Sequence, residues 1–518
     1  MVDIMHWADV EANTLLQKGS IHLINTGITP SGTLHVGTLR EAITAEAVRK
    51  AVAKLGANVR MIYLVDSFDP LRKRYPFLPE SFEAEVGRAL AYIPCPCGEH
   101  KNYAQHYIQP FLDSIKELGI HCDVLWTHEQ YEQGKFAEVI DMAITKKDLV
   151  TQILKEVSGR DVPKGFYPYS PRCSECGRLT HAKVEGYEFP YVSYTCACGH
   201  HGRADIRRAD GKMPWRVEWA AKWKVFGVTC EPFGKDHAAA GGSYDTGVRL
   251  AREVFGIDPP HPIPYEFVQL KGKGQMHKST GSSVTGVDAL RITPASVMNY
   301  IVLRVNPNRH IDYDAGLGIL DMVDEYDRVE NMYYCGGCEE RDRDLLRGYE
   351  LSQPEGPRSK LPLQVPYRHL VSLVQITDGF DGVLSVLRRM GAIDDSVSPE
   401  DMGILKQRVD CVRYWLDSFA PNEVKFAVCE AMPACELTEQ EKTFLRDLLA
   451  AMEGVEWKGE RIHDAMYGCA KGAAIGARGG FQTLYRIFCD QKQGPRLGFF
   501  LSTLDRDFVL GRIREAGK

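Results

Sequence analysis

Residues 26–38 read TGITPSGTLHVGT, and this stretch decides the fold of the chain. The apolar run Ile21–Ile24 precedes it, and an alanine-rich, helix-like segment from about Leu39 to Lys54 follows it. A strand, a turn rich in glycine and proline, and then a helix together direct backbone N–H groups and a helix dipole toward a bound phosphate. The stretch has the glycine spacing of neither the Walker loop nor the dinucleotide fingerprint. It therefore predicts a phosphate-binding turn of another kind.

The alternation of strands and helices continues on both sides of a long interruption. Further strands of the same sheet are predicted at 59–66, 124–126, 228–233 and 265–270. Helices are expected over 136–157, as one long element, and over 244–255. Because parallel strands need crossover connections of this kind, the pattern indicates a split α/β domain. We expect its halves at 1–90 and 207–290, with an insertion at 91–206.

Beyond residue 290 apolar residues recur at three- and four-residue spacing, which is typical of amphipathic helices. Predicted helices include 294–303, 317–333, 403–418, 424–430, 438–452, 460–469 and 481–488. Breaks rich in proline and glycine, such as 352–357, separate them. We therefore expect an all-α C-terminal region, which we divide into 291–365 and 366–518.

Composition and charge indicate which classes of protein to expect. The chain has 518 residues, 44% of them hydrophobic, and a net charge of −6. It has no apolar run long enough to span a bilayer and no secretory signal, so we expect no membrane association and a cytoplasmic location. The negative net charge does not indicate a nucleic-acid partner, but it does not exclude one, because phosphate contacts need only a local basic face.

The cysteines favour metal binding over disulfides. Two close pairs, Cys173 with Cys176 and Cys196 with Cys198, have the separation expected of a tetrahedral zinc knuckle. His200 or His201 could replace one cysteine in the fourth position. The residues between the pairs suit a small β-ribbon without a core of its own, so the metal would supply folding energy. Cys335 and Cys338 could form a further site.

Two motifs in the expected order carry a family resemblance. Residues 35–38, His-Val-Gly-Thr, resemble the HIGH signature of class I aminoacyl-tRNA synthetases, and residues 268–281, VQLKGKGQMHKSTG, resemble their KMSKS loop. Further matching stretches lie at 29–32, 216–223, 232–237, 308–314, 320–328 and 494–498. Together they resemble the class I lysyl-tRNA synthetases of archaeal type, from about residue 5 to 515.

The resemblance implies a Rossmann-like domain of the HUP type with a zinc-containing insertion, followed by the all-α region. It implies activation of L-lysine with ATP, with Mg²⁺ on the phosphates, and transfer of the lysyl group to tRNA(Lys). The protein then mainly positions reactants and stabilises charge. The region 291–365 would contact the tRNA stem, and 366–518 would bind the anticodon.

Matched residue by residue to the motifs of the family, the resemblance implies three sets of site residues. The catalytic set is His35, Gly37, Thr38, Lys278 and Ser279. The ATP-binding set is Pro30, Ser31, His35, Gly37, Gly234, Asp236, Met276 and Lys278. The lysine-binding set is Gly27, Thr29, Trp219, Asp236, His237 and Tyr265, with Trp219 covering the aliphatic stem. The second motif departs from the family pattern, because its outer lysines are missing and one lysine lies inside it.

The family often has a second, mixed-ligand metal site near residue 100. We expect it to be built from Cys95, Glu99, His100 and His106, although Cys97 competes for a place among the ligands. Both metal sites would be structural, because four protein ligands leave no open position.

Three alternatives stay open at this point. The altered second motif would suit a noncatalytic, tRNA-binding paralogue of a synthetase. A class I synthetase for another amino acid would share the same motifs. A smaller nucleotidylyl-transferring enzyme of the same fold would lack the long helical region.

Overall fold

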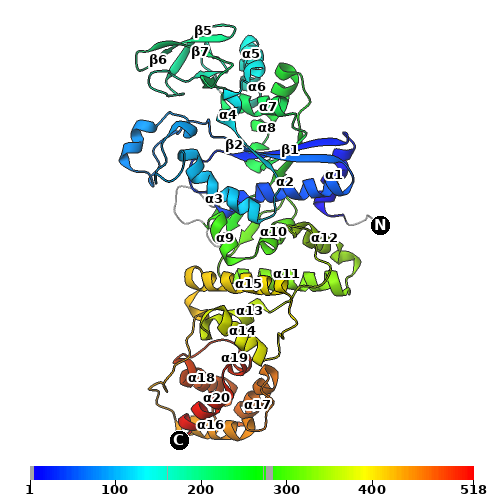
Figure 1. The fold of residues 1–518 in the computed structure, drawn as a ribbon, viewed down its shortest axis with the longest axis vertical. Helices are drawn as coiled ribbons and strands as arrows, with labels where there is room; N and C mark the ends of the chain where they lie inside the picture. Colours follow the sequence, from blue (N-terminus) through cyan, green and yellow to red (C-terminus); the bar gives the residue numbers. More distant parts are fainter. Residues whose placement is uncertain (1–4, 160, 272–273, 276–283) are drawn as a thin grey trace. The chain divides into compact units, whose positions relative to one another are not determined.

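The computed structural model describes residues 5–159, 161–271, 274–275 and 284–518. The chain divides into two compact units (Figure 1). The first consists of Met1–Leu290, Ala295–Tyr313 and Gly336–Pro357. The second consists of Arg291–Pro294, Asp314–Cys335 and Arg358–Lys518. Each unit is described by itself below.

A five-stranded parallel sheet forms the centre of the first unit, in the order β10-β9-β1-β2-β3. Its strands are β1 (Ile21–Ile28), β2 (Asn58–Val65), β3 (Asp123–Trp126), β9 (Cys230–Gly234) and β10 (His261–Tyr265). The predicted α/β fold is confirmed. β1 lies between β2 and β9, so the strand order reverses beside it, and open parallel sheets bind ligands at such a point.

The alanine-rich helix α2 (Val36–Lys54) connects β1 to β2, as predicted. Its buried alanines, among them Ala42, Ala45 and Ala51, let other elements approach closely. α2 packs against α1 (Trp7–Leu16), α10 (Ala295–Leu303) and α12 (Arg343–Ser352) as well as the sheet. Figure 1 shows α1 and α2 running beside the strands β1 and β2.

Residues 91–206 contain more than an insertion, because β3 lies within them and pairs with β2. Helices α3 (Tyr103–Glu117) and α4 (Thr127–Glu132) flank β3. The predicted single helix over 136–157 is wrong: it is two helices, α5 (Ala137–Thr145) and α6 (Lys147–Ser158). They separate at Lys146, whose backbone angles of φ −98° and ψ 26° are not helical.

A small antiparallel sheet follows, made of β5 (Ala182–Glu188), β6 (Tyr191–Cys196) and β7 (His201–Asp205). The short strands β4 (Ser170–Pro171) and β8 (Gly211–Lys212) pair beside it. The ribbon packs onto the rest of the first unit. Its Val192 and Tyr194 belong to the same buried cluster as Phe136 and Trp223.

After β8 come α7 (Trp215–Phe226), β9, and the helical stretch of α8 (Ser243–Arg249) and its π-helical continuation Leu250–Phe255. The predicted strand over 265–270 is wrong, because two strands share this stretch. β10 ends at Tyr265, and β11 (Val268–Leu270) pairs with β12 (Gly274–Gln275) and β13 (Ile311–Tyr313) in another sheet. The Glu266 N–H bonds the Pro307 carbonyl at 2.8 Å, which takes the chain out of the main sheet.

The second unit is helical in the part that the structure describes. Its helices are α11 (Gly318–Cys335), α13 (Tyr367–Ile376), α14 (Gly379–Arg389), α15 (Pro399–Ser418), α16 (Glu439–Met452), α17 (Gly459–Gly472), α18 (Gly476–Cys489), α19 (Leu497–Thr503) and α20 (Arg506–Ala516). Phe444, Leu484 and Phe488 lie in a buried apolar cluster of this unit.

The predicted helix over 424–430 is wrong. Only a 3-10 turn, Asn422–Val424, is present there. The following backbone is bound by other elements instead: the Phe426 N–H donates to the Gln375 side chain at 2.8 Å and the Cys429 N–H to the Phe488 carbonyl at 2.8 Å.

Among the described residues, no single helix is long and apolar enough to cross a bilayer. α13 and α14 meet the length and composition criteria only as a pair, and they are bent against each other by 117°.

Candidate active site

A cavity of about 1040 Å³ opens at the carboxyl ends of β1 and β9, where the strand order reverses. Of the residues predicted from the sequence, it is lined by Gly27, Thr29, Ser31, His35, Gly37, Thr38, Trp219, Gly234, Asp236, His237 and Tyr265. Pro30 is buried in the same turn without lining the cavity. Met276, Lys278 and Ser279 lie outside the described residues. Three segments that are distant in the sequence therefore meet at one cavity.

The turn between β1 and α2 depends on close approaches that only glycine permits. A Cβ atom on Gly27 would lie 2.3 Å from the Leu64 carbonyl oxygen of the neighbouring strand. A Cβ on Gly37 would lie 2.9 Å from Nδ1 of His35, which occupies the N-cap position of α2. The Val36 N–H bonds the Val284 carbonyl at 2.9 Å. These contacts hold the imidazole at the helix start, beside the cavity.

Sequence reasoning missed Glu41, which stands on α2 and lines the cavity. Its Oε1 accepts hydrogen bonds from the Thr26 hydroxyl and, at 2.9 Å, from the Gly27 N–H. Its Oε2 accepts from the Tyr265 hydroxyl at 2.7 Å. Burial raises the pKa of Glu41, against these hydrogen bonds. A cation in the cavity would relieve that penalty.

A second missed carboxylate, Glu231 on β9, also lines the cavity and is buried. It accepts hydrogen bonds from Trp219 Nε1 at 2.9 Å, Trp223 Nε1 at 2.5 Å and Asn25 Nδ2 at 2.7 Å. Burial raises its pKa to about 7. The bond to Glu231 fixes the amide of Asn25, and Asn25 Oδ1 is buried without a donor among the described residues. An unused buried acceptor beside two carboxylates is a site for a donor with positive charge.

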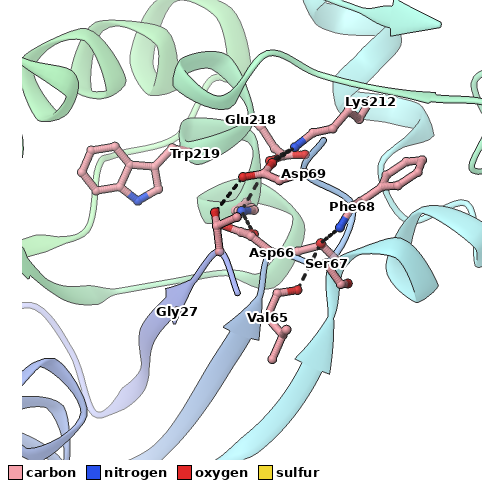
Figure 2. Close-up of polar contacts among 12 residues, drawn as sticks. Gly27, Val65, Asp66, Ser67, Phe68, Asp69, Lys212, Glu218 and Trp219 are labelled. Carbon is pink, nitrogen blue, oxygen red and sulfur yellow. Dashed lines mark hydrogen bonds and ion pairs between the residues drawn. The ribbon is translucent and has the colours of Figure 1, made fainter. Parts of the chain in front are cut away.

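A network of buried ion pairs joins the end of β2 to α7 (Figure 2). Lys212 binds Asp69, and its Nζ lies 3.0 Å from Glu218. Lys222 binds Asp66, and its Nζ lies 3.5 Å from Glu218. Three carboxylates thus face two ammonium groups, which leaves one negative charge to be balanced.

The two aspartates of this network are not equivalent. Burial raises the pKa of Asp66, which lines the cavity, to about 6. Burial would also raise the pKa of Asp69, but the charge and hydrogen bond of Lys212 outweigh it and lower that pKa. Asp69 in turn accepts from the Thr29 hydroxyl at 2.7 Å. The network therefore fixes the Thr29 side chain at the cavity wall.

Aromatic rings form another part of the wall. The ring of Trp219 lies 5.4 Å from that of Trp215 and 5.6 Å from that of His237. Burial lowers the pKa of His237 and so disfavours its charged form, although Asp236 lies 3.6 Å away. A flat apolar surface of this kind suits an aliphatic chain.

Four cysteines gather in the small sheet region. The sulfur atoms of Cys173, Cys176, Cys196 and Cys198 all lie within 4.8 Å of one another. Burial would raise the pKa of the Cys173 thiol, but backbone N–H groups of Cys176 and Glu175 lower it to about 7. Neither His200 nor His201 belongs to this group. Four convergent thiols are the donor set of a structural zinc site.

A second group is formed by Cys95, Cys97, His100 and His106, whose donor atoms also lie within 4.8 Å of one another. Glu99, which the sequence analysis included, does not belong to the group, and Cys97 takes its place. Glu99 adjoins His100 in sequence, but the chain turns at Gly98, with φ +78°, and the Glu99 carboxylate is not among the converging donors. Two thiols and two imidazoles also fit zinc.

Comparison with known proteins identifies the family. The family model described as "tRNA synthetases class I (K)" matches residues 5–355. The chain belongs to this family. The family's curated members include lysine–tRNA ligases of Thermoplasma acidophilum, 42% identical over 98% of both chains, and of Methanosarcina barkeri, 41% identical over 100% of this chain and 98% of the relative. The one from Archaeoglobus fulgidus is 40% identical over 99% of this chain and 100% of the relative.

A solved glutamate tRNA ligase from Elizabethkingia meningosepticum aligns with 96% of the chain, with a TM-score of 0.42 and 12% identity. The lysine–tRNA ligases named above match this chain over nearly its full length. The solved glutamate tRNA ligase is too distant to inform the site of this chain.

Proposed function

We propose that the chain is a lysine–tRNA ligase and that the cavity described above is its active site. The full-length similarity to ligases of this name supports the reaction. The observation that supports lysine as the amino acid is the set of carboxylates that line the cavity. Glu41, Asp66 and Glu231 line it, and Lys222 forms an ion pair with Asp66. Lysine brings two ammonium groups to such a site.

The side-chain ammonium of lysine has three N–H donors. Glu41, Glu231 and Asn25 Oδ1 offer three acceptors in the cavity wall. Trp219 and Tyr265 then cover the aliphatic stem, and a cation beside aromatic rings gains about 0.5–2 kcal/mol. Thr29, held by Asp69, and the pocket-facing Asp66 are placed to receive the α-ammonium group. Gly27, Asp236 and His237 complete the proposed lysine site.

ATP would bind at the turn after β1. The N-terminus of α2 and the side chains of Ser31 and His35 face its α-phosphate, and Gly37 leaves room for adenosine. Gly234, Asp236 and Pro30 belong to the same proposed site. Mg²⁺ would neutralise the phosphates. We also keep Thr38, Met276, Lys278 and Ser279 in the proposal on the resemblance of their motifs.

The first reaction step is a displacement at phosphorus. A lysine carboxylate oxygen bonds to the α-phosphorus of ATP, the bond to the bridging oxygen breaks, and pyrophosphate leaves. A hydroxyl of the terminal adenosine of tRNA(Lys) then takes the lysyl group, and AMP leaves. The chain's own residues align the carboxylate and stabilise charge on the phosphate oxygens.

Binding of tRNA belongs to the helical parts of the chain in this proposal. We assign 291–365 to the stem and 366–518 to the anticodon, as the resemblance implies. The cytoplasmic location expected from the sequence also stays a prediction.

The experiment that tests the function is ATP–pyrophosphate exchange with each of the twenty amino acids, with and without tRNA. Exchange that depends on lysine supports the proposal. Exchange that depends on another amino acid would mean that the chain is a class I synthetase for that amino acid. No exchange by folded, metal-replete protein would favour the noncatalytic paralogue.

The pH dependence of lysine binding tests the role of Glu231. Its pKa of about 7 in the free protein means that it becomes protonated as the pH falls from 8 to 6. Because an ammonium ion binds the ionised carboxylate, we expect KM for lysine to rise by about tenfold over this interval, while KM for ATP changes little. Substitution of Glu231→Gln should remove most of this dependence and leave the smaller part due to Asp66, whose pKa is about 6. A constant KM for lysine in the unmodified protein would argue against contact with Glu231.

We propose zinc in both donor groups, as a structural ion. In the small sheet, Cys173→Ser should remove one equivalent of metal and lower the melting temperature, since the metal ties the turn at Cys173 to β6. Metal analysis and thermal unfolding measure both effects. Cys435→Ser, outside either group, serves as the control and should keep the full metal content.

A further inference from the structure

A hydrogen bond joins the turn assigned to ATP to the helix that carries part of the second donor group. Tyr103, in the first turn of α3, is fully buried, and its hydroxyl donates to the Ser31 carbonyl oxygen at 2.9 Å. The Tyr103 N–H donates to the Ile93 carbonyl at 2.9 Å. One side chain thus links α3 to a residue that lines the cavity.

A second contact reaches the next residue of the turn. A Cβ on Gly32 would lie 3.0 Å from Cζ of Phe77, so this ring rests on the turn. The Phe77 ring lies 5.7 Å from that of Tyr107, edge to face, and the Tyr107 ring lies 4.7 Å from that of Tyr103. Residues on α3 therefore support the turn at two consecutive positions.

The same turns of α3 hold a donor of the second metal group. His106 and Tyr107 stand three and four residues after Tyr103, so the three side chains share one face of the helix. The rings of His106 and Tyr107 lie 4.5 Å apart. Nδ1 of His106 lies 3.6 Å from Cys95 Sγ and 3.2 Å from Cys97 Sγ. A metal in this group would fasten the segment before α3 to the face that carries Tyr103.

We propose that Tyr103 is a positioning residue for ATP, and that metal binding by Cys95, Cys97, His100 and His106 holds it against the Ser31 turn. The inference rests on the proposed function only in assigning this turn to ATP. The metal takes no part in the reaction. Its loss should weaken ATP binding more than lysine binding, because the groups proposed to bind the side-chain ammonium of lysine, Asn25, Glu41 and Glu231, stand on β1, α2 and β9.

The test uses the full chain and measures metal content together with the equilibrium Kd for ATP and for lysine. Cys97→Ser should lose one equivalent of metal and weaken ATP binding by about fivefold to tenfold, as expected for about one hydrogen bond. Tyr103→Phe keeps the ring and should keep the metal, but should weaken ATP binding similarly. The double variant should be little worse than either single one, because both act through one contact.

Matched controls exist for each substitution. Cys198→Ser should also lose one metal equivalent, from the other group, without changing the Kd for ATP. Tyr92→Phe removes a hydroxyl that donates to Glu132 at 2.8 Å instead of to the turn, and should bind ATP normally.

Three results would overturn the inference: a wild-type chain without metal in this group, an unchanged Kd for ATP after metal loss in Cys97→Ser, or fully additive effects in the double variant. Failure of the proposed function looks different, because the wild-type chain would then show no lysine-dependent pyrophosphate exchange.

Discussion

Substitution of Glu41→Gln should raise KM for lysine by about 100-fold and leave KM for ATP nearly unchanged. A lysine ammonium that enters the cavity loses its water, and removal of one partner from such a buried pair costs about 3 kcal/mol, or about two powers of ten. Glutamine should preserve the local structure. Its oxygen can accept from Thr26 and Gly27, and its amide can donate to the Tyr265 hydroxyl. Lysine-dependent exchange kinetics measure the effect.

The control for this variant is Glu46→Gln, on the same helix. Glu46 is buried, but it pairs with Arg49 at 2.6 Å and does not line the cavity. We expect it to keep the normal KM for lysine. Equal effects of both substitutions would mean that Glu41 acts through the stability of α2 and does not bind substrate.

Local patterns were sufficient for the first strand, turn and helix of the sheet domain, β1 and α2. The apolar run before residue 26 predicts β1, and the alanine periodicity after residue 38 predicts α2. Both patterns are local, so the sequence alone was enough to predict these two elements. The same reading failed at Lys146, because two helices with continuous apolar spacing can be separated by one non-helical residue. It also failed at 265–270, where a contact with Pro307, far along the chain, ends the strand.

Asp236 was found from a motif, but Glu41 and Glu231 were not, because distant elements bring the charged and polar groups of the site together. Lys212 and Asp69 are separated by 143 residues, and Asn25 and Glu231 by 206. Two weaker signals were available. Glu231 is a charged residue within a buried parallel strand, which requires partners or a ligand. Glu41 stands four residues after Gly37 and so shares its helix face.

Substitution of His35→Ala should lower the rate of lysyl-adenylate formation by about 10²–10³-fold, the usual cost of removing one donor to a transition-state oxyanion. Negative charge develops on the α-phosphate oxygens as pyrophosphate leaves, and His35 stands at the helix start that faces them in our assignment. The binding of lysine should be unaffected, because its acceptors, Glu41, Glu231 and Asn25, are untouched. Single-turnover kinetics and equilibrium lysine binding separate these two effects.

Two further variants show whether the imidazole acts as a donor. His35→Asn keeps an N–H donor near the position of Nδ1 and should recover part of the rate, whereas a residue that only shapes the turn would be replaced equally well by alanine. His310→Ala removes an exposed histidine outside the cavity and should keep the full rate. Because Gly37 admits no side chain beside the imidazole, Gly37→Ala should displace the ring and reproduce the loss seen in His35→Ala. A normal rate in both His35→Ala and Gly37→Ala would show that this turn takes no part in the reaction. The acidic cavity would then be an amino-acid site alone.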